Sequence, residues 1–71
     1  MAINNPETLT RARQQLAHIT NADDSGRAHG WYMRAVGWFN ALHAERLIDE
    51  ATYDGLMAEA SNIREACRAK A

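Results

Sequence analysis

The chain has 71 residues and a mass of 7.9 kDa, which leaves room for one small domain and excludes a second. Its 8 Lys and Arg residues nearly balance its 9 Asp and Glu residues, giving a net charge of −1, which argues against a dedicated binder of nucleic acid or of anionic membranes. Much of the 46% hydrophobic content is alanine, so the core is thin and self-association is one way to enlarge it.

The cellular compartment is indicated by cysteine usage and by the absence of targeting signals. A single cysteine, Cys67, cannot form an internal disulfide, and the N-terminus has no basic segment followed by an apolar run. The most apolar stretch, residues 31–42, is far shorter than the roughly 20 residues that span a bilayer. We therefore expect a cytoplasmic protein without a membrane span.

The first helix is predicted over about residues 6–19. Asn5 is a suitable N-cap, Pro6 fits the first helical position, and Glu7 favours the positive end of the helix dipole. Apolar residues then recur at steps of three and four and form one stripe: Leu9, Ala12, Leu16 and Ile19. The segment 20–26 that follows is rich in turn-forming residues and predicts a loop.

The second helix is predicted over about residues 27–47 and has two contrasting faces. One face is bulky and apolar and contains Ala28, Tyr32, Ala35, Phe39 and Leu42, with Trp31 and Trp38 at its edge. The opposite face is made of small residues with one methionine beside them: Gly30, Gly37, Ala41, Ala44 and Met33.

The third helix is predicted over about residues 50–69, with Asp49 as its N-cap. Its apolar stripe contains Tyr53, Leu56, Ala60, Ile63 and Cys67. The short connection to the second helix makes the two helices run back against each other. The sequence therefore predicts an all-α fold of residues 1–71, a long antiparallel helical hairpin with a shorter N-terminal helix.

Metal sites are not supported by the spacing of potential ligands. His29 and His43 lie fourteen residues apart, about 21 Å along a continuous helix, and His18 lies on another helix. Four loop residues match the start of a calcium-binding loop: Asn21, Asp23, Ser25 and Gly26. The twelfth position of such a loop needs a bidentate Glu, and here it is Tyr32. We expect no metal and no cofactor.

Catalytic groups are equally poorly supported. Cys67 lies on an apolar stripe, where burial makes a thiol inert. The carboxylate pairs Asp23–Asp24 and Asp49–Glu50 precede predicted helices, where negative charge stabilises the helix start. The sequence therefore favours a binding module over an enzyme.

The aromatic cluster of the second helix suggests a partner-binding site. Trp31 and Trp38 lie at the edge of the core stripe, where a thin core leaves part of a wide ring exposed, and Arg34 lies beside them. Tryptophan with arginine is the composition enriched in binding hot spots. We predict that Trp31, Arg34 and Trp38 bind a protein partner.

The small-residue face suggests close approach by another helix, because glycine inside an exposed helix costs about 1 kcal/mol relative to alanine. The glycines could also simply be tolerated. Otherwise a second copy covers this face in a homodimer, or the first helix covers it within the chain, in which case the aromatic edge is the expected dimer interface. The residues predicted for self-association are Gly30, Met33, Gly37, Ala41 and Ala44.

One stretch resembles small helical proteins of phages and mobile elements: Gly37-Trp38-Phe39-x-Ala41-Leu42, then Leu47-Ile48-Asp49, Tyr53 and Leu56. These proteins include a helical-hairpin quorum-sensing anti-activator and several anti-CRISPR proteins. The glycine usual before the Leu-Ile-Asp turn is replaced by Glu45-Arg46. The resemblance implies a phage inhibitor that occludes a host regulator or defence complex and acts without catalysis.

Two other functions remain open. A small nucleotide or signalling ligand could bind between protomers through Arg11, Arg27 or Arg34 with a stacking aromatic ring. The turn at residues 47–49 could also belong to a DNA-binding helix-turn-helix. Asp49, Glu50 and Asp54 at the start of the third helix would repel phosphates, so nucleic-acid binding is the less favoured function.

Overall fold

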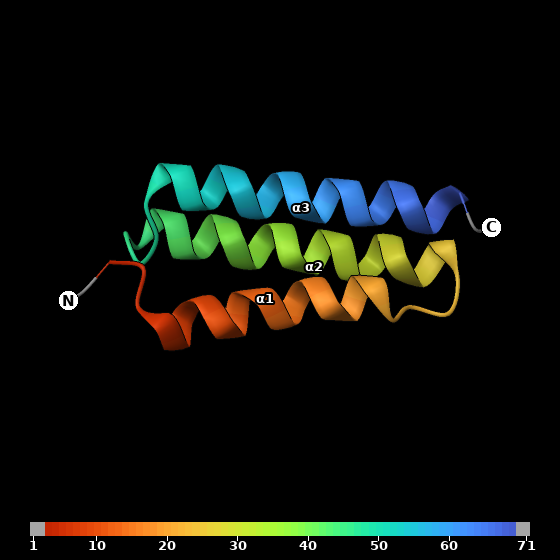
Figure 1. Cartoon of the computed structure of the whole chain (residues 1–71), viewed down its shortest axis with the longest axis horizontal. Coiled ribbons are helices and arrows are strands. Elements are labelled where there is room, and N and C mark those ends of the chain that lie inside the picture. The colour runs from red at the N-terminus through yellow and green to blue at the C-terminus, as the bar shows by residue number, and fades with distance from the viewer. Residues whose placement is uncertain (1–2, 70–71) are drawn as a thin grey trace.

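The computed structural model describes residues 3–69 and forms three helices, α1 (Pro6–Thr20), α2 (Ser25–Ala44) and α3 (Glu50–Ala69) (Figure 1). Consecutive helices run in opposite directions, so α1 and α3 point the same way (Figure 1). The bundle is elongated, 42 × 17 × 15 Å, and its two short dimensions are nearly equal. Each helix therefore packs against both others, and the predicted all-α fold of three helices is confirmed.

The proportions of the bundle differ from the predicted hairpin with a shorter accessory helix. The helices have 15, 20 and 20 residues, which are similar lengths, and α1 packs along α2 much as α3 does. Helix α2 occupies 25–44, where about 27–47 was predicted. It begins earlier because Asp24 caps it, and it ends earlier because the chain turns at Arg46.

The core lies along the axis of the bundle and is built from the predicted stripes, with Ile48 of the turn before α3 added to them. It contains the following fully or nearly fully buried residues: Ala12, Leu16, Ile19, Ala28, Ala35, Phe39, Ile48, Leu56 and Ala60. Four of these are alanines, so the helices approach closely and little apolar surface is enclosed. Phe39 is the largest side chain that is fully buried. The core is therefore as thin as the composition indicated.

The start of each helix is fixed by a side chain that precedes it. The Asn5 side chain accepts a hydrogen bond from the Glu7 amide at 2.9 Å, and the Asp24 carboxylate accepts one from the Arg27 amide at 2.8 Å. The Asp49 carboxylate accepts one from the Thr52 amide at 2.8 Å. These bonds satisfy amides that have no partner within the helix, so the N-cap roles predicted for Asn5 and Asp49 are confirmed, and Asp24 is a third cap that was not predicted as one.

Helix α2 ends in a left-handed turn without glycine. The Leu47 amide donates to the Leu42 carbonyl at 2.9 Å, and the Arg46 amide donates to the His43 carbonyl at 3.0 Å. This is the Schellman pattern, in which the residue after the C-cap adopts positive φ and is usually glycine. Here it is Arg46, with φ 59°.

The N-terminal segment is tied to the turn between α2 and α3. The Asn4 side chain donates to the Asp49 carboxylate at 2.9 Å and accepts from the Asp49 amide at 3.2 Å. The Asn4 amide also donates to the Leu47 carbonyl at 2.9 Å. These bonds hold both segments at the same end of the bundle (Figure 1).

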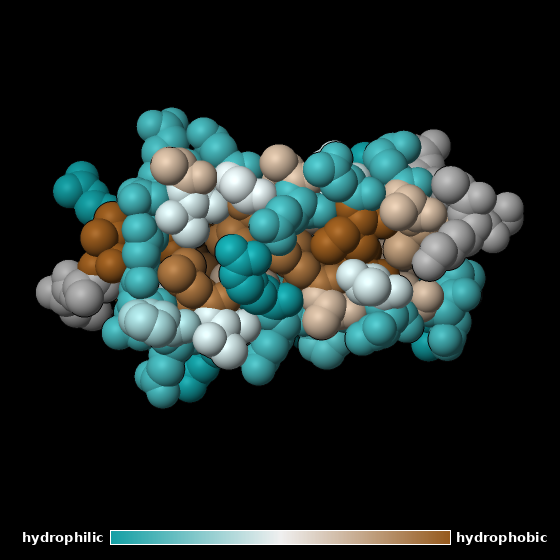
Figure 2. Space-filling view, viewed as in Figure 1, coloured by the Kyte–Doolittle hydropathy of each residue, from teal (hydrophilic) through white to brown (hydrophobic). Residues whose placement is uncertain are grey.

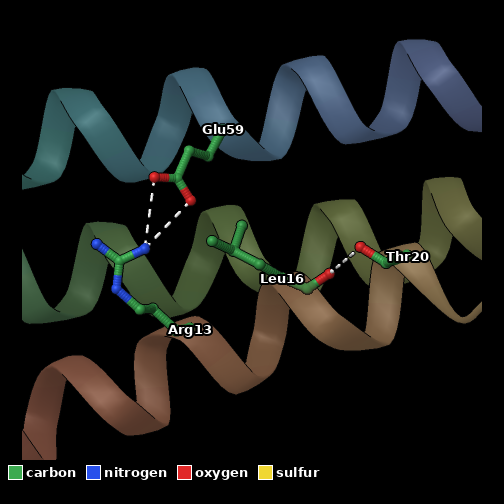
Figure 3. Close-up of polar contacts among 4 residues, drawn as sticks. All are labelled: Arg13, Leu16, Thr20 and Glu59. Carbon is green, nitrogen blue, oxygen red and sulfur yellow. Dashed lines mark hydrogen bonds and ion pairs between the residues drawn. The ribbon is translucent and has the colours of Figure 1, made fainter.

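The side of the bundle formed by α1 and α3 carries a narrow hydrophobic strip between hydrophilic side chains (Figure 2). Arg13 on α1 and Glu59 on α3 form an ion pair across this strip at 3.3 Å, passing in front of α2 (Figure 3). Both side chains are about half exposed or more, at 61% and 49%, so the pair adds little stability. In Figure 3 the ion pair lies in front of the α2 ribbon, on the side of the bundle that α1 and α3 form.

We predict that Arg46→Gly stabilises the protein, because glycine adopts positive φ without the steric cost that a Cβ brings. Arg46→Ala is the matched control, since it removes the same charge and keeps the Cβ. We expect Arg46→Gly to be more stable than Arg46→Ala by about 1 kcal/mol in urea unfolding. Equal stabilities would show that this turn carries no strain.

Asp49 makes the stability of the fold depend on pH in a predictable direction. Hydrogen bonds from the side chain and amide of Thr52 and from the Asn4 side chain hold the pKa of Asp49 below its ordinary value of 3.8. A lowered pKa stabilises the fold above pH 3.8, and this contribution is lost as the pH falls through the lower, folded-state pKa.

We predict that Asp49→Asn lowers the melting temperature at neutral pH, because it keeps a capping oxygen and removes the charge. The difference from the wild-type protein should shrink below pH 3.8. Circular dichroism melting curves from neutral to acidic pH measure it. A difference that stays constant across this range contradicts the assignment.

Candidate functional site

The candidate site is the exposed side of α2, on the far side from α1 and α3. Its residues are all exposed, and we call them together the α2 face: Arg27, Gly30, Met33, Arg34, Gly37, Trp38, Ala41 and Ala44. The buried residues of α2, Ala28, Ala35 and Phe39, lie on the opposite side and face the core. The α2 face is thus the half of the helix that its own chain does not cover.

The α2 face is unusual because it contains so little charge. Arg27 and Arg34 are the only residues among Lys, Arg, Asp and Glu in the whole of α2. The exposed side of a helix in a soluble bundle usually carries many charged residues. The exposed residues of α3 include Glu50, Asp54 and Glu59, in keeping with that rule.

Two large apolar side chains stand out on the α2 face. Met33 is 54% exposed and Trp38 is 40% exposed. Single exposed apolar residues are ordinary, but here they flank a row of glycines and alanines on the same helix. Arg27 and Arg34 are the charged residues among these small and apolar ones.

Gly30 and Gly37 are open to solvent. A Cβ added at either position would meet no described atom within 4 Å, apart from the helix's own neighbouring residues and backbone. The alternative in which the first helix covers the small-residue face within the chain is therefore wrong. Helix α1 instead packs against the edge of α2 that carries Trp31, as shown by the contact between Trp31 and His18.

Trp31 and Trp38 have different environments, although their sequence contexts are alike. Trp31 is half-buried against the core, and its ring stacks on the His18 ring of α1 with centroids 4.3 Å apart. The Arg34 guanidinium carbon lies 5.3 Å from the Trp31 ring centroid, a cation–π contact. Trp38 is thus the more accessible indole of the two, and Arg34 lies between them on the surface.

A shallow hollow of about 260 Å³ opens beside these residues and is lined by Arg27, Gly30, Trp31 and Arg34. The two arginines lie two helical turns apart and border the space above Gly30, where a side chain would intrude. A second hollow of about 480 Å³ lies at the start of α2, between Ser25, Gly26, His29 and Arg64.

Several ring contacts between helices could not be found from the sequence. The His43 ring of α2 stacks on Tyr53 of α3 at 4.6 Å, and the Arg64 guanidinium carbon lies 4.2 Å from the Tyr32 ring centroid. The Tyr53 hydroxyl donates to the Asn40 side chain. Tyr32 and Tyr53 belong to the predicted apolar stripes, but the stripes do not specify the register between helices.

Groups that could support other chemistry are not gathered into a site. Among residues 3–69, no three His, Cys, Asp or Glu side chains lie close enough to hold a metal ion. Cys67 is half-buried, and its thiol donates to the Ile19 carbonyl at 3.5 Å. Within the same residues, every helix is too short or too polar to cross a membrane.

Comparison of the chain with models of known protein families, with curated proteins and with solved structures finds no match.

We predict that Gly30→Ala and Gly37→Ala each stabilise the isolated chain. Alanine forms helix more readily than glycine by about 1 kcal/mol, and the added methyl group meets open space. Gly55→Ala on α3, where the space is also open, is the matched control and should give a similar gain. Urea unfolding at low protein concentration measures all three. A loss of stability at Gly30 or Gly37 would mean that the chain itself packs against these glycines.

Proposed function

We propose that the protein is a non-enzymatic binding module that uses the α2 face to bind another protein. The observation that carries this proposal is the combination of exposed Trp38 and Met33 with open Gly30 and Gly37 on a helix almost without charge. Tryptophan and arginine supply much of the binding energy at protein interfaces, and small residues let a partner approach closely. Trp38 and Arg34 would be the main contacts, with Trp31 at their edge.

The sharpest form of this proposal is an inhibitor encoded by a phage or another mobile element. Its target would be a regulator or a defence complex in the host cytoplasm, and it would act by covering a surface that the target needs. The resemblance around Gly37-Trp38-Phe39 and Leu47-Ile48-Asp49 supports this form. Occlusion requires only a folded protein with one binding surface, which a short capped bundle provides.

We predict that Trp38→Ala and Arg34→Ala each weaken partner binding by about tenfold or more, as is typical of hot-spot residues. Both side chains are exposed, so circular dichroism should show an unchanged fold. The experiment is affinity capture from host lysate with quantitative mass spectrometry, followed by calorimetry with the purified partner.

Arg11→Ala is the matched control for Arg34→Ala, because Arg11 is an exposed arginine on α1, away from the α2 face. It should leave capture and affinity unchanged. The proposal is contradicted if Trp38→Ala and Arg34→Ala bind the same partner with the affinity of the wild-type protein.

The hollow beside Trp31 favours a second candidate, a small phosphorylated ligand. Arg27 and Arg34 could bind phosphate oxygens, and the hollow of about 260 Å³ is large enough for part of a nucleotide. A melting temperature raised by a nucleotide, and no longer raised in Arg27→Ala, would favour this candidate over the binding module.

DNA binding has no comparable support. The start of α3 is acidic: Asp49 is the helix cap, and Glu50 and Asp54 nearby are exposed. These charges would repel a phosphate backbone.

A further inference from the structure

The α2 face carries a repeat that is complementary to itself. Its central residues are separated alternately by three and four positions: Arg27, Gly30, Arg34, Gly37, Ala41 and Ala44. This is the spacing of residues that meet along the seam between two packed helices. All of them are exposed, so the seam runs along the middle of the uncovered side of α2.

We infer that two copies of the chain pair through this seam, with their α2 helices antiparallel about a two-fold axis between Ala35 and Val36. The inference rests on the proposed function, because it names a second copy as one occupant of the α2 face. It goes further because it fixes the orientation and the register of the pair.

The register follows from the sizes of the side chains. With the axis between Ala35 and Val36, Arg27 lies opposite the partner's Ala44 and Arg34 lies opposite the partner's Gly37. Gly30 lies opposite the partner's Ala41. Each long side chain therefore meets a small residue, and the two backbones can approach closely where the open Gly30 faces the partner's Ala41.

A parallel pair lacks this complementarity. In register, it would place Arg27 against the partner's Arg27 and Arg34 against the partner's Arg34. Like charges would then face each other at both arginine positions along the seam, while the glycines would face glycines and leave gaps. The antiparallel pair avoids both faults.

Charge favours the same register. Glu45, the C-cap of α2, is exposed and lies on the same side of the helix as Arg27, since eighteen residues make five helical turns. In the antiparallel pair, Arg27 lies next to the partner's Glu45 at each end of the seam. The contact with Trp31, one turn before Arg34, draws each Arg34 guanidinium away from the two-fold axis and from the partner's Arg34.

The pairing also assembles the aromatic surface. A two-fold axis perpendicular to both helices keeps the tryptophan-bearing edges of the two copies on the same side of the dimer. Trp38 then lies near the partner's Trp31, and the exposed edges of four indoles line one strip. A partner protein would meet this composite strip, to which each copy contributes half.

The test is sedimentation equilibrium of the full chain over a concentration series that reaches about 1 mM, because a single pair of helices buries an area near the lower end of specific interfaces. We expect a reversible dimer of twice the 7.9 kDa chain mass. Arg27→Glu should weaken the dimer about tenfold, and so should Glu45→Arg. Each substitution places like charges at positions 27 and 45 of the two copies, and the two-fold symmetry makes this repulsion occur twice. The double variant should recover most of the wild-type affinity.

Gly37→Phe should abolish the dimer, because Gly37 faces the partner's Arg34 at the centre of the seam. Gly55→Phe on α3 is the matched control and should leave it intact, since both glycines face open space in the single chain. A monomer at every concentration overturns the inference. So do a double variant that fails to recover, and masses beyond the dimer, which would indicate that the α2 face binds a different surface of the next copy.

These results separate the inference from the proposed function. If the chain is monomeric and Trp38→Ala still abolishes capture of the partner, the proposed function stands and the dimer does not. If the chain dimerises and responds to charge reversal as expected, but Trp38→Ala still captures the partner, the dimer stands and the proposed function does not.

Discussion

The structure depends on how much of a helix two neighbours can cover. In a bundle of three, α1 and α3 cover the side of α2 that carries Ala28, Ala35 and Phe39, and leave the other side in water. A helix in this position usually gives its free side charged residues, but α2 has only two arginines, with glycines, alanines, Met33 and Trp38 between and beside them. The binding proposal and the antiparallel dimer both follow from this imbalance.

The rest of the chain fixes where the helices begin and how the segments at one end of the bundle are connected. Caps at Asn5, Asp24 and Asp49 fix where each helix begins, and Asn4 ties the N-terminal segment to the turn before α3. Alanines in the core bring the helices close together without enclosing much apolar surface. A core this thin keeps the bundle small.

The sequence predicts the fold well wherever the deciding interaction is local. Capping residues and apolar stripes depend on spacing within one helix, so the three helices and most core residues could be predicted. The end of α2 could not, because Arg46 adopts a backbone conformation that usually marks glycine. The different exposures of Trp31 and Trp38 could not be predicted from the sequence either, since they depend on where His18 of α1 lies against α2.

The central proposal is that the molecule binds other chains through the α2 face. Nuclear magnetic resonance of the labelled chain over a concentration series, or with a purified partner, tests this most directly residue by residue. The account predicts that amide shift changes gather at exposed positions of α2, with Gly30, Gly37 and the Trp38 indole among the largest. Shift changes confined to the exposed residues of α1 and α3 would contradict it.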